Sequence, residues 1–359
     1  GYSWQTALLA VFVEGVIFIV LSLTRVREAI FNAIPPTLKK AVSVGIGLFI
    51  AFIGLKNAGL VVANQSTFVA ITSFTENFNT SGICAVLALV GTLFTFVLHA
   101  RNVRGSVLIG IIATWALGII CQLCGLYVPG EGYASLIPSF GMTDFTALGL
   151  TFGQCFNVDF NAFDITNFIV IVFSFLFVDL FDTLGTLIGV SSRAGMLDEN
   201  GRLPKIRPAL LADAIATTAG AVLGTSTTTT FVESSAGVGA GGRTGLTAVT
   251  TAVLFLLSIF LAPIFVAIPS FATAPALIVV GFMMFSAITQ IKFDKDALTD
   301  TIPAYICIIA MPLFYSISEG ISLGMISYAV INVCCGKAKK VPPLVYVLCV
   351  LFILKYIFL

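Results

Sequence analysis

Residues 224–243 decide the fold class; they read Gly-Thr-Ser-Thr-Thr-Thr-Thr-Phe-Val-Glu-Ser-Ser-Ala-Gly-Val-Gly-Ala-Gly-Gly-Arg. The hydroxyl-rich, β-branched run from Thr225 to Val232 favours extended backbone, and Glu233-Ser234-Ser235 is typical of a helix start. We therefore predict a short extended piece and then a half helix, which together cross a membrane once. Such backbone is tolerated at membrane depth only where protein buries it or it lines a cavity, toward which the half helix would turn its free N–H groups. A surface loop rich in Thr and Gly is the alternative.

The composition of the whole chain indicates a membrane protein. The 359 residues are 58% hydrophobic and only 10% charged, and the mean hydropathy is +1.07. Soluble domains carry about 25% charged residues. The net charge of +1 gives no indication of a nucleic-acid partner. The eight cysteines lie mostly inside apolar runs without metal-ligand spacing, and His99 is interpreted as an interfacial residue, so we predict no metal and no cofactor.

Apolar segments predicted to cross the membrane follow one another along the chain, at 5–24, 38–59, 83–100, 104–124, 166–190, 208–224, 225–241, 244–266, 273–290, 301–317 and 321–335. The loops between them alternate between those that carry Lys or Arg, such as 25–40 and 191–207, and those that carry neither, such as 60–82 and 125–165. This alternation predicts a multi-pass protein of the cell membrane with Gly1 outside and Lys337 in the cytoplasm. The sequence does not decide whether the closing apolar stretch 343–359 crosses the lipid bilayer or lies at its interface.

Three short matches in the same order predict an internal repeat. Residues 6–11 resemble residues 244–249, Ala33-Ile-Pro35 recurs as Ala267-Ile-Pro269, and Gly47 corresponds to Gly281 at the same offset of 234 (281 − 47 and 269 − 35). An odd number of predicted crossings separates the two copies, so they face opposite ways across the bilayer. Inverted repeats are typical of secondary transporters, whose substrate sites lie near the midplane on interrupted segments.

Carboxylates inside the predicted spans are the candidate functional residues, since a charge at the bilayer centre costs about 2.5–3.5 kcal/mol and usually faces a cavity. Asp179 and Asp182 are three residues apart and are expected to share a helix face. A structural role is an open alternative for Asp179. Glu14 shows no obvious partner and is interpreted as structural, and Asp213 is expected to pair locally near Arg207.

Asp182 and Glu233 are the two acids that lie near span midpoints and flank Gly-rich or interrupted backbone. A pair of carboxylates suits a planar heterocycle, because each can accept a hydrogen bond from a ring N–H or an exocyclic amine. Burial disfavours the charged form of a carboxyl group, so one of the pair could carry a coupling proton. These properties do not by themselves identify the heterocycle.

At these residues the chain resembles the adenine/guanine/hypoxanthine permeases, the Azg-like branch of the nucleobase:cation symporter-2 family. The resemblance covers the chain to about residue 340 and is carried by residues 1–8, 41–54, 177–186, 225–237 and 241–246. It implies proton-coupled uptake of purine nucleobases by alternating access. A homodimer is an open possibility for the assembly. It also implies an all-α polytopic fold of two inverted seven-span repeats, with a core domain, a gate domain and short strands at the midplane.

The resemblance implies a site built on the eighth and tenth spans. Asp182 and Glu233 occupy the positions of the family's two substrate-binding acids, and Phe231, Thr230 and Ser234 are expected beside them. The candidates for proton coupling are Glu233, Asp182 and Asp179.

The implied domains alternate along the chain. They are core residues 1–24 (span 4), gate residues 25–124 (spans 5–7), an extracytoplasmic loop at 125–165, core residues 166–266 (spans 8–11), gate residues 267–340 (spans 12–14) and the extra apolar segment 341–359.

Both the resemblance and the repeat predict about three further spans before Gly1, because the Asp182 span, the Asp213 span and the interrupted segment precede the second copy. The chain is therefore expected to be truncated at its amino terminus.

Three rival functions remain open at this point. An anion transporter or channel of the same fold would favour a cationic centre, whereas the predicted centre is acidic. A membrane-embedded enzyme would need a catalytic cluster, such as paired histidines or a metal set, and the chain has one histidine. A structural membrane protein would leave the buried carboxylates unexplained.

Overall fold

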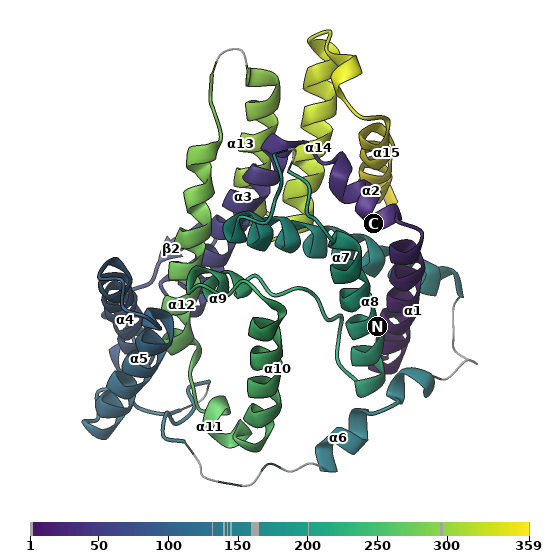
Figure 1. Cartoon of the computed structure of the whole chain (residues 1–359). Coiled ribbons are helices and arrows are strands. Elements are labelled where there is room, and N and C mark those ends of the chain that lie inside the picture. The colour runs from purple at the N-terminus through teal and green to yellow at the C-terminus, as the bar shows by residue number, and fades with distance from the viewer. Residues whose placement is uncertain are drawn as a thin grey trace. The chain divides into compact units, whose positions relative to one another are not determined.

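The computed structural model describes residues 3–130, 132–138, 141, 143, 146–158, 165–199, 201–294 and 297–358, and nearly all regular structure in them is helical (Figure 1). Eight helices in these ranges are long and apolar enough to cross a membrane. The principal helices are α1 (Trp4–Leu23), α3 (Pro36–Asn57), α4 (Ile83–Ala100), α5 (Ser106–Leu123), α7 (Ile165–Ala194), α8 (Ile206–Leu223), α10 (Gly245–Phe260), α12 (Ser270–Phe285), α13 (Leu298–Leu313), α14 (Ile317–Cys334) and α15 (Pro343–Phe358). The expected all-α polytopic fold is confirmed. Parts of the expected 125–165 loop, and Leu359, lie outside the described residues.

Two predicted segments differ from the structure. The span expected at 244–266 is divided at Leu261 into α10 and α11 (Ala262–Val266), because Pro263 in the first turn of α11 has no backbone N–H to continue the helix. The strand expected after Thr225 does not form. Residues 225–231 are neither helix nor strand and bond to α8 instead, where the Thr217 hydroxyl donates to the Thr228 carbonyl at 2.9 Å. Helix α9 (Ser234–Gly239) then has only six residues.

A β-hairpin and several short helices were not predicted. Strands β1 (Val61–Asn64) and β2 (Phe68–Ile71) pair antiparallel, with Val61 opposite Ile71. The Asn64 side-chain oxygen closes their turn by accepting the backbone N–H of Ser66 at 2.8 Å and of Thr67 at 3.0 Å. The short helices are α2 (Val26–Ala33), α6 (Thr146–Thr151), the π-helical turn η1 (Phe78–Gly82) and the 3₁₀ turns η2 (Gln154–Phe156), η4 (Ser286–Gln290) and η6 (Ala338–Lys340).

The chain forms two compact units. The first comprises Gly1–Ile46, Asp144–Val232 and Ser286–Leu359, and the second comprises Gly47–Thr143 and Glu233–Phe285. The boundaries of these units differ from those of the expected core and gate domains. The core and gate domains stay a prediction.

In the first unit, α1 and α8 pack along one another (Figure 1). Gly15 makes the close approach possible, since a Cβ atom there would lie 2.9 Å from the backbone nitrogen of Thr218; small residues serve this purpose where membrane helices meet. The closing helix α15 is held by aromatic contacts. The buried ring of Phe352 lies 5.2 Å from that of Phe177 and 4.8 Å from that of Phe181, both on α7.

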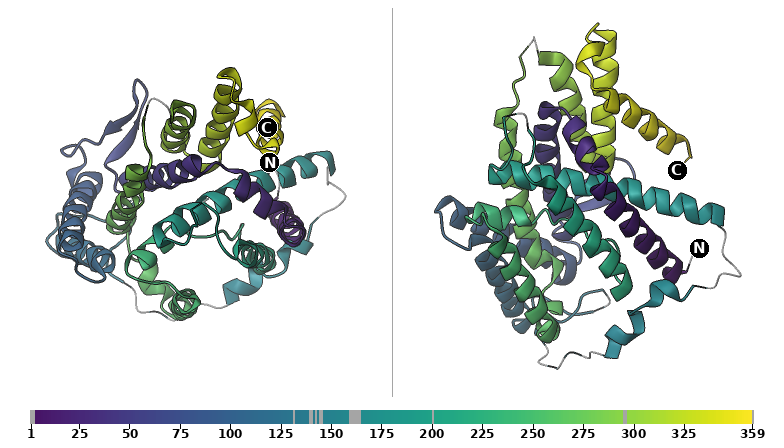
Figure 2. Two further views of the ribbon diagram at one scale, coloured as in Figure 1. Left: turned by 45° about the horizontal axis from the view of Figure 1, so that its top comes forward. Right: turned by 45° about the vertical axis from the view of Figure 1, so that its right-hand side comes forward.

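In the second unit, α4, α5 and α12 form a three-helix group that is visible in both views of Figure 2. Glycine and threonine alternate across the α4–α5 contact. Gly91 faces Thr114 and Gly110 faces Thr95, so any side chain at either glycine would overlap the opposite threonine. A core of buried apolar residues, among them Leu87, Leu136 and Phe271, fills the space between these helices and the loops beside them.

Candidate functional site

The side chain of Asp182, on α7, lies at the amino end of α14. Its side chain projects from α7 and is half-buried, and its carboxylate accepts the backbone N–H of Ser318 in the first turn of α14. The unsatisfied N–H groups and the positive dipole end of a helix stabilise a carboxylate at this position. Among the described residues, the Oδ1 atom of Asp182 is buried without a hydrogen-bond partner. One acceptor of this carboxylate is therefore free.

Asp179 does not share the surroundings of Asp182, contrary to the expectation from their spacing. Asp179 is 4% exposed and is directed toward α1 and α8, where it interacts with Glu14 and Asp213, whereas Asp182 is directed toward α14. The two positions are about 60° apart around α7, and different helices cover each of them. The two aspartates can therefore have different roles.

The expected pairing of Asp213 near Arg207 is wrong. Arg27 of α2, which is 186 residues away in sequence, donates to the Asp213 carboxylate at 3.0 Å, and the two side chains are 0% and 4% exposed. Arg27 also donates to the Leu210 carbonyl at 3.0 Å and lies over the ring of Phe18, 4.2 Å from its centroid. Arg207 donates to the Leu23 carbonyl at 3.2 Å instead. The turn between α1 and α2 is what carries Arg27 onto α8.

Glu14 has partners that the sequence did not reveal. Its side chain is completely buried, it accepts the Thr227 hydroxyl at 3.4 Å, and it lies within hydrogen-bonding reach of Asp179. The Thr183 hydroxyl lies 3.3 Å from Asp179 and 3.4 Å from Asp213. We call Glu14, Asp179, Asp213 and Arg27 the acidic cluster. Its members come from four different helices, so no local sequence pattern could have shown it.

The non-helical segment 225–231 is fixed to the acidic cluster. The Thr227 hydroxyl bonds to Glu14, and the backbone N–H of Thr230 bonds to the Asp213 carboxylate. Phe231 follows directly, and its side chain is 62% exposed. Two of the predicted substrate contacts, Thr230 and Phe231, are therefore positioned by buried charges and not by a strand.

Glu233 and Ser234 belong to the second unit, and both are exposed. Glu233 is the residue that precedes α9, and its backbone carbonyl accepts the N–H of Ala236 at 2.9 Å. Asp182 belongs to the first unit, so the joint use of the two acids in one site stays a prediction.

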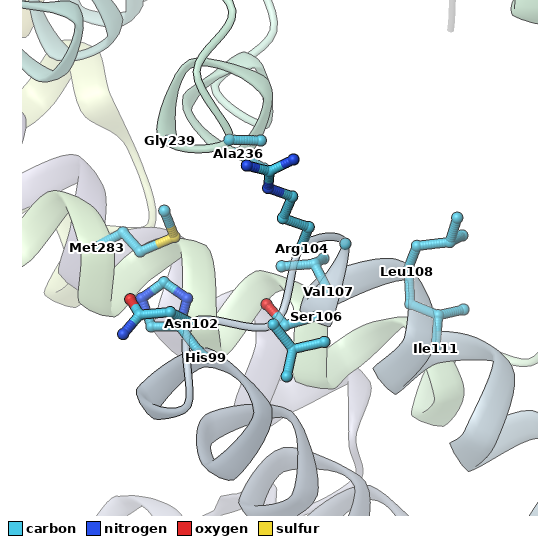
Figure 3. A pocket seen from close by; sticks show the side chains of 13 residues that line it. His99, Asn102, Arg104, Ser106, Val107, Leu108, Ile111, Ala236, Gly239 and Met283 are labelled. Atoms are coloured by element: carbon cyan, nitrogen blue, oxygen red, sulfur yellow. The ribbon is translucent and has the colours of Figure 1, made fainter.

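A cavity of about 500 Å³ lies in the second unit between the α4–α5 turn, α9 and α12. Figure 3 shows the side chain of Arg104 extending toward Ala236 and Gly239 of α9, with His99 on the opposite side near Met283. A second cavity of about 450 Å³ is lined by residues that include Tyr127 and Phe271. Neither cavity contains a predicted substrate residue. No group of three metal-ligating side chains occurs in the described part of the chain.

A buried, partly charged cluster in membrane-length helices is the arrangement expected of a transport protein. A family model described as a permease family matches residues 1–323. The chain belongs to this permease family. It is 46% identical to the guanine/hypoxanthine permease PbuG of Bacillus subtilis over 357 residues, which are 99% of this chain and 76% of that protein. It is 38% identical to the adenine permease AdeP of Escherichia coli over 360 residues, 100% of this chain and 76% of that protein.

A third relative is about as similar to this chain as PbuG is. The putative permease MJ0326 of Methanocaldococcus jannaschii is 45% identical over 357 residues, 99% of this chain and 77% of that protein. The unmatched part of each relative does not by itself place segments before Gly1, so the expected truncation is not supported by these comparisons. Family membership and the apolar helices establish a multi-pass protein of the cell membrane.

Proposed function

We propose that this permease takes up purine nucleobases by proton-coupled alternating access and is not an enzyme. The similarity to guanine/hypoxanthine and adenine permeases supports the substrate class. The observation that carries the proposal is the Asp182 carboxylate, which lies on a membrane-length helix with one oxygen held by the α14 amino end and the other free. A purine ring N–H is a suitable donor to that oxygen, which is buried in this structure, so substrate reaches it only if the surrounding helices move.

The other predicted residues have roles that fit the same substrate. The exposed ring of Phe231 offers a face for stacking on a planar base. Thr230 and Ser234 supply hydroxyl groups, and Glu233 supplies a second carboxylate that can accept an exocyclic amine. These assignments, the inverted seven-span repeat, the core and gate domains and a homodimer are predictions. The anion-transporter alternative is less well supported, because the free polar group on α7 is a carboxylate.

Uptake assays test the proposal. The natural full-length protein, reconstituted in liposomes, should accumulate radiolabelled hypoxanthine, guanine or adenine when the outside is more acidic, and excess uracil or sulfate should not compete. Asp182→Asn and Glu233→Gln should each abolish uptake without loss of folded protein. The matched controls are Asp294→Asn and Glu76→Gln, which make the same changes at exposed positions. Preference for uracil or sulfate over every purine would refute the substrate class.

A further inference from the structure

The acidic cluster holds more carboxyl groups than its buried cation can balance. Three carboxyl groups and one guanidinium carry a net charge of −2 if all are ionised (1 − 3), and the three carboxyl groups lie on helices long and apolar enough to cross a membrane. Arg27 donates to Asp213 and to the Leu210 carbonyl, and its charge also acts on Glu14 and Asp179. Among the described residues, Glu14 and Asp179 form no ion pair of their own and share the one cation with Asp213, so two further buried charges here are costly.

The cost of the buried negative charge falls if Glu14 and Asp179 share a proton. Their carboxyl groups lie within hydrogen-bonding reach of each other. Among the described residues, Glu14 Oε1 and Asp179 Oδ2 are both buried without a partner when each is treated as an acceptor. A single proton on one carboxyl group would turn that repulsive contact into a hydrogen bond and lower the cluster charge by one, as in carboxyl pairs that titrate together.

The charges that act on the pair come from the Arg27–Asp213 ion pair and from Asp182. Arg27 from α2 and Asp213 from α8 face it as an ion pair, Thr183 faces it from α7, and Thr227 from the non-helical segment. The turn η2, which packs on α1, consists of Gln154, Cys155 and Phe156 and brings no charged side chain. Asp182 on α7 is directed toward α14, but its charge also acts on Asp179.

Two elements join the Glu14–Asp179 pair to the proposed purine site: helix α7 and the non-helical segment 225–231. Asp182 is three residues beyond Asp179 on α7, about 4.5 Å along the helix axis. The segment that carries Thr230 and Phe231 is bonded to Glu14 through Thr227 and to Asp213 through its backbone. A change in the charge of the pair therefore acts on both parts of the first unit that are proposed to contact substrate.

From this geometry we infer that Glu14 and Asp179 form a shared-proton pair that carries the coupling proton, separate from the acids that bind the base. The inference rests on the proposed purine transport. One proton passes from water to the carboxyl pair as purine binds, and it returns to water on the other side of the membrane after release. On uptake an O–H bond of hydronium breaks and a carboxyl O–H bond forms, and release reverses this exchange. Glu233 holds no transported proton.

Calorimetry on the purified full-length protein tests this assignment. Hypoxanthine binding is measured in buffers of different ionisation enthalpy, which gives the number of protons taken up per purine, and it is repeated across pH. Above the titration range of the purine-free pair, wild-type protein should take up close to one proton per purine, and its affinity should fall up to about tenfold per pH unit. Glu14→Gln supplies an amide donor in place of the proton. It should bind hypoxanthine with little proton uptake and a nearly flat pH profile, whereas Glu76→Gln should match the wild type.

Transport assays distinguish a failure of this inference from a failure of the proposed function. Glu14→Gln should still exchange labelled for unlabelled hypoxanthine but should lose accumulation driven by a proton gradient, and Glu14→Asp should restore part of it. Wild-type proton uptake in Glu14→Gln, or loss of exchange together with binding, would overturn the inference. If Glu14→Gln does not fold, wild-type binding without proton uptake overturns it equally. A wild-type protein that binds no purine refutes the proposed function instead.

Discussion

Gly47 of α3 and Gly281 of α12 pack directly against one another, and each backbone occupies the space that a side chain on the other would need. A Cβ atom on Gly47 would lie 2.7 Å from the Gly281 carbonyl oxygen, and a Cβ atom on Gly281 would lie 2.5 Å from the Gly47 carbonyl oxygen. These two residues are equivalent positions in the predicted repeat. Equivalent positions that contact each other reciprocally are what a two-fold relation between two helices produces.

A second pattern supports the repeat. In the α4–α5 pair, Gly91 faces Thr114 and Gly110 faces Thr95; in the α13–α14 pair, Gly324 faces Cys307 and Gly320 faces Met311. In both pairs the facing positions are four residues apart on each helix, with a glycine in each contact. The correspondence therefore extends beyond the three matches that the sequence showed.

The glycine contact predicts an unusual stability effect. Gly47→Ala should destabilise the protein even though alanine favours a helix by about 1 kcal/mol over glycine, because the added methyl meets a backbone oxygen that cannot rotate away. A cost of about 1–3 kcal/mol is expected from overpacking. Thermal unfolding in detergent measures it. Gly245→Ala is the control, since nothing lies within 4 Å of its Cβ position; equal melting temperatures for the two variants would contradict the contact.

The Arg27–Asp213 ion pair predicts strong coupling between the two residues. Arg27→Met leaves a buried carboxylate without its cation and should cost about 3–5 kcal/mol of unfolding free energy. Adding Asp213→Leu should restore much of that loss, because the remaining charge is then removed as well. Arg25→Gln, at an exposed position two residues earlier, should have little effect. The prediction fails if the double variant is no more stable than Arg27→Met.

The anchoring of the non-helical segment can be tested at two adjacent threonines. Thr217→Val removes the donor to the partly buried Thr228 carbonyl and should cost about 1 kcal/mol, the net contribution of a typical hydrogen bond. Purine affinity should fall too, since Thr230 and Phe231 follow in the same segment. Thr218→Val removes only a bond to Ala214 within α8. Binding and melting curves that do not distinguish these variants would show that the segment is held by other contacts.

The docking of α15 on α7 predicts a stability effect next to Asp182, because Phe352 packs against Phe181 and the charge of Lys355 acts on Asp182. Phe352→Ala should destabilise the first unit by about 3–5 kcal/mol, since the ring is fully buried against Phe177 and Phe181. The control Ile353→Ala changes a neighbour that is 47% exposed and should be nearly neutral. Similar melting temperatures for the two variants would show that α15 is not part of the folded core.

Hydropathy and short matches were sufficient to predict much of this protein. The apolar runs predicted the helices because a membrane-spanning segment must satisfy its own backbone hydrogen bonds, which makes length and composition decisive. The offset of 234 residues identified Gly47 and Gly281 as equivalent. The motif around Asp182 and the run from Thr225 to Glu233 indicated the permease family, which the comparisons confirm.

Only the tertiary structure decided which buried charges meet. Asp213 pairs with Arg27 across 186 residues and not with its neighbour Arg207, and Glu14 finds its partners on α7 and in the non-helical segment. Asp179 and Asp182 face different helices although their spacing suggested one face. The physical reason is that periodicity fixes the direction of a side chain around its own helix, whereas its partner depends on how the other helices pack. That packing is set by contacts such as Gly15 against Thr218, which are distant in sequence.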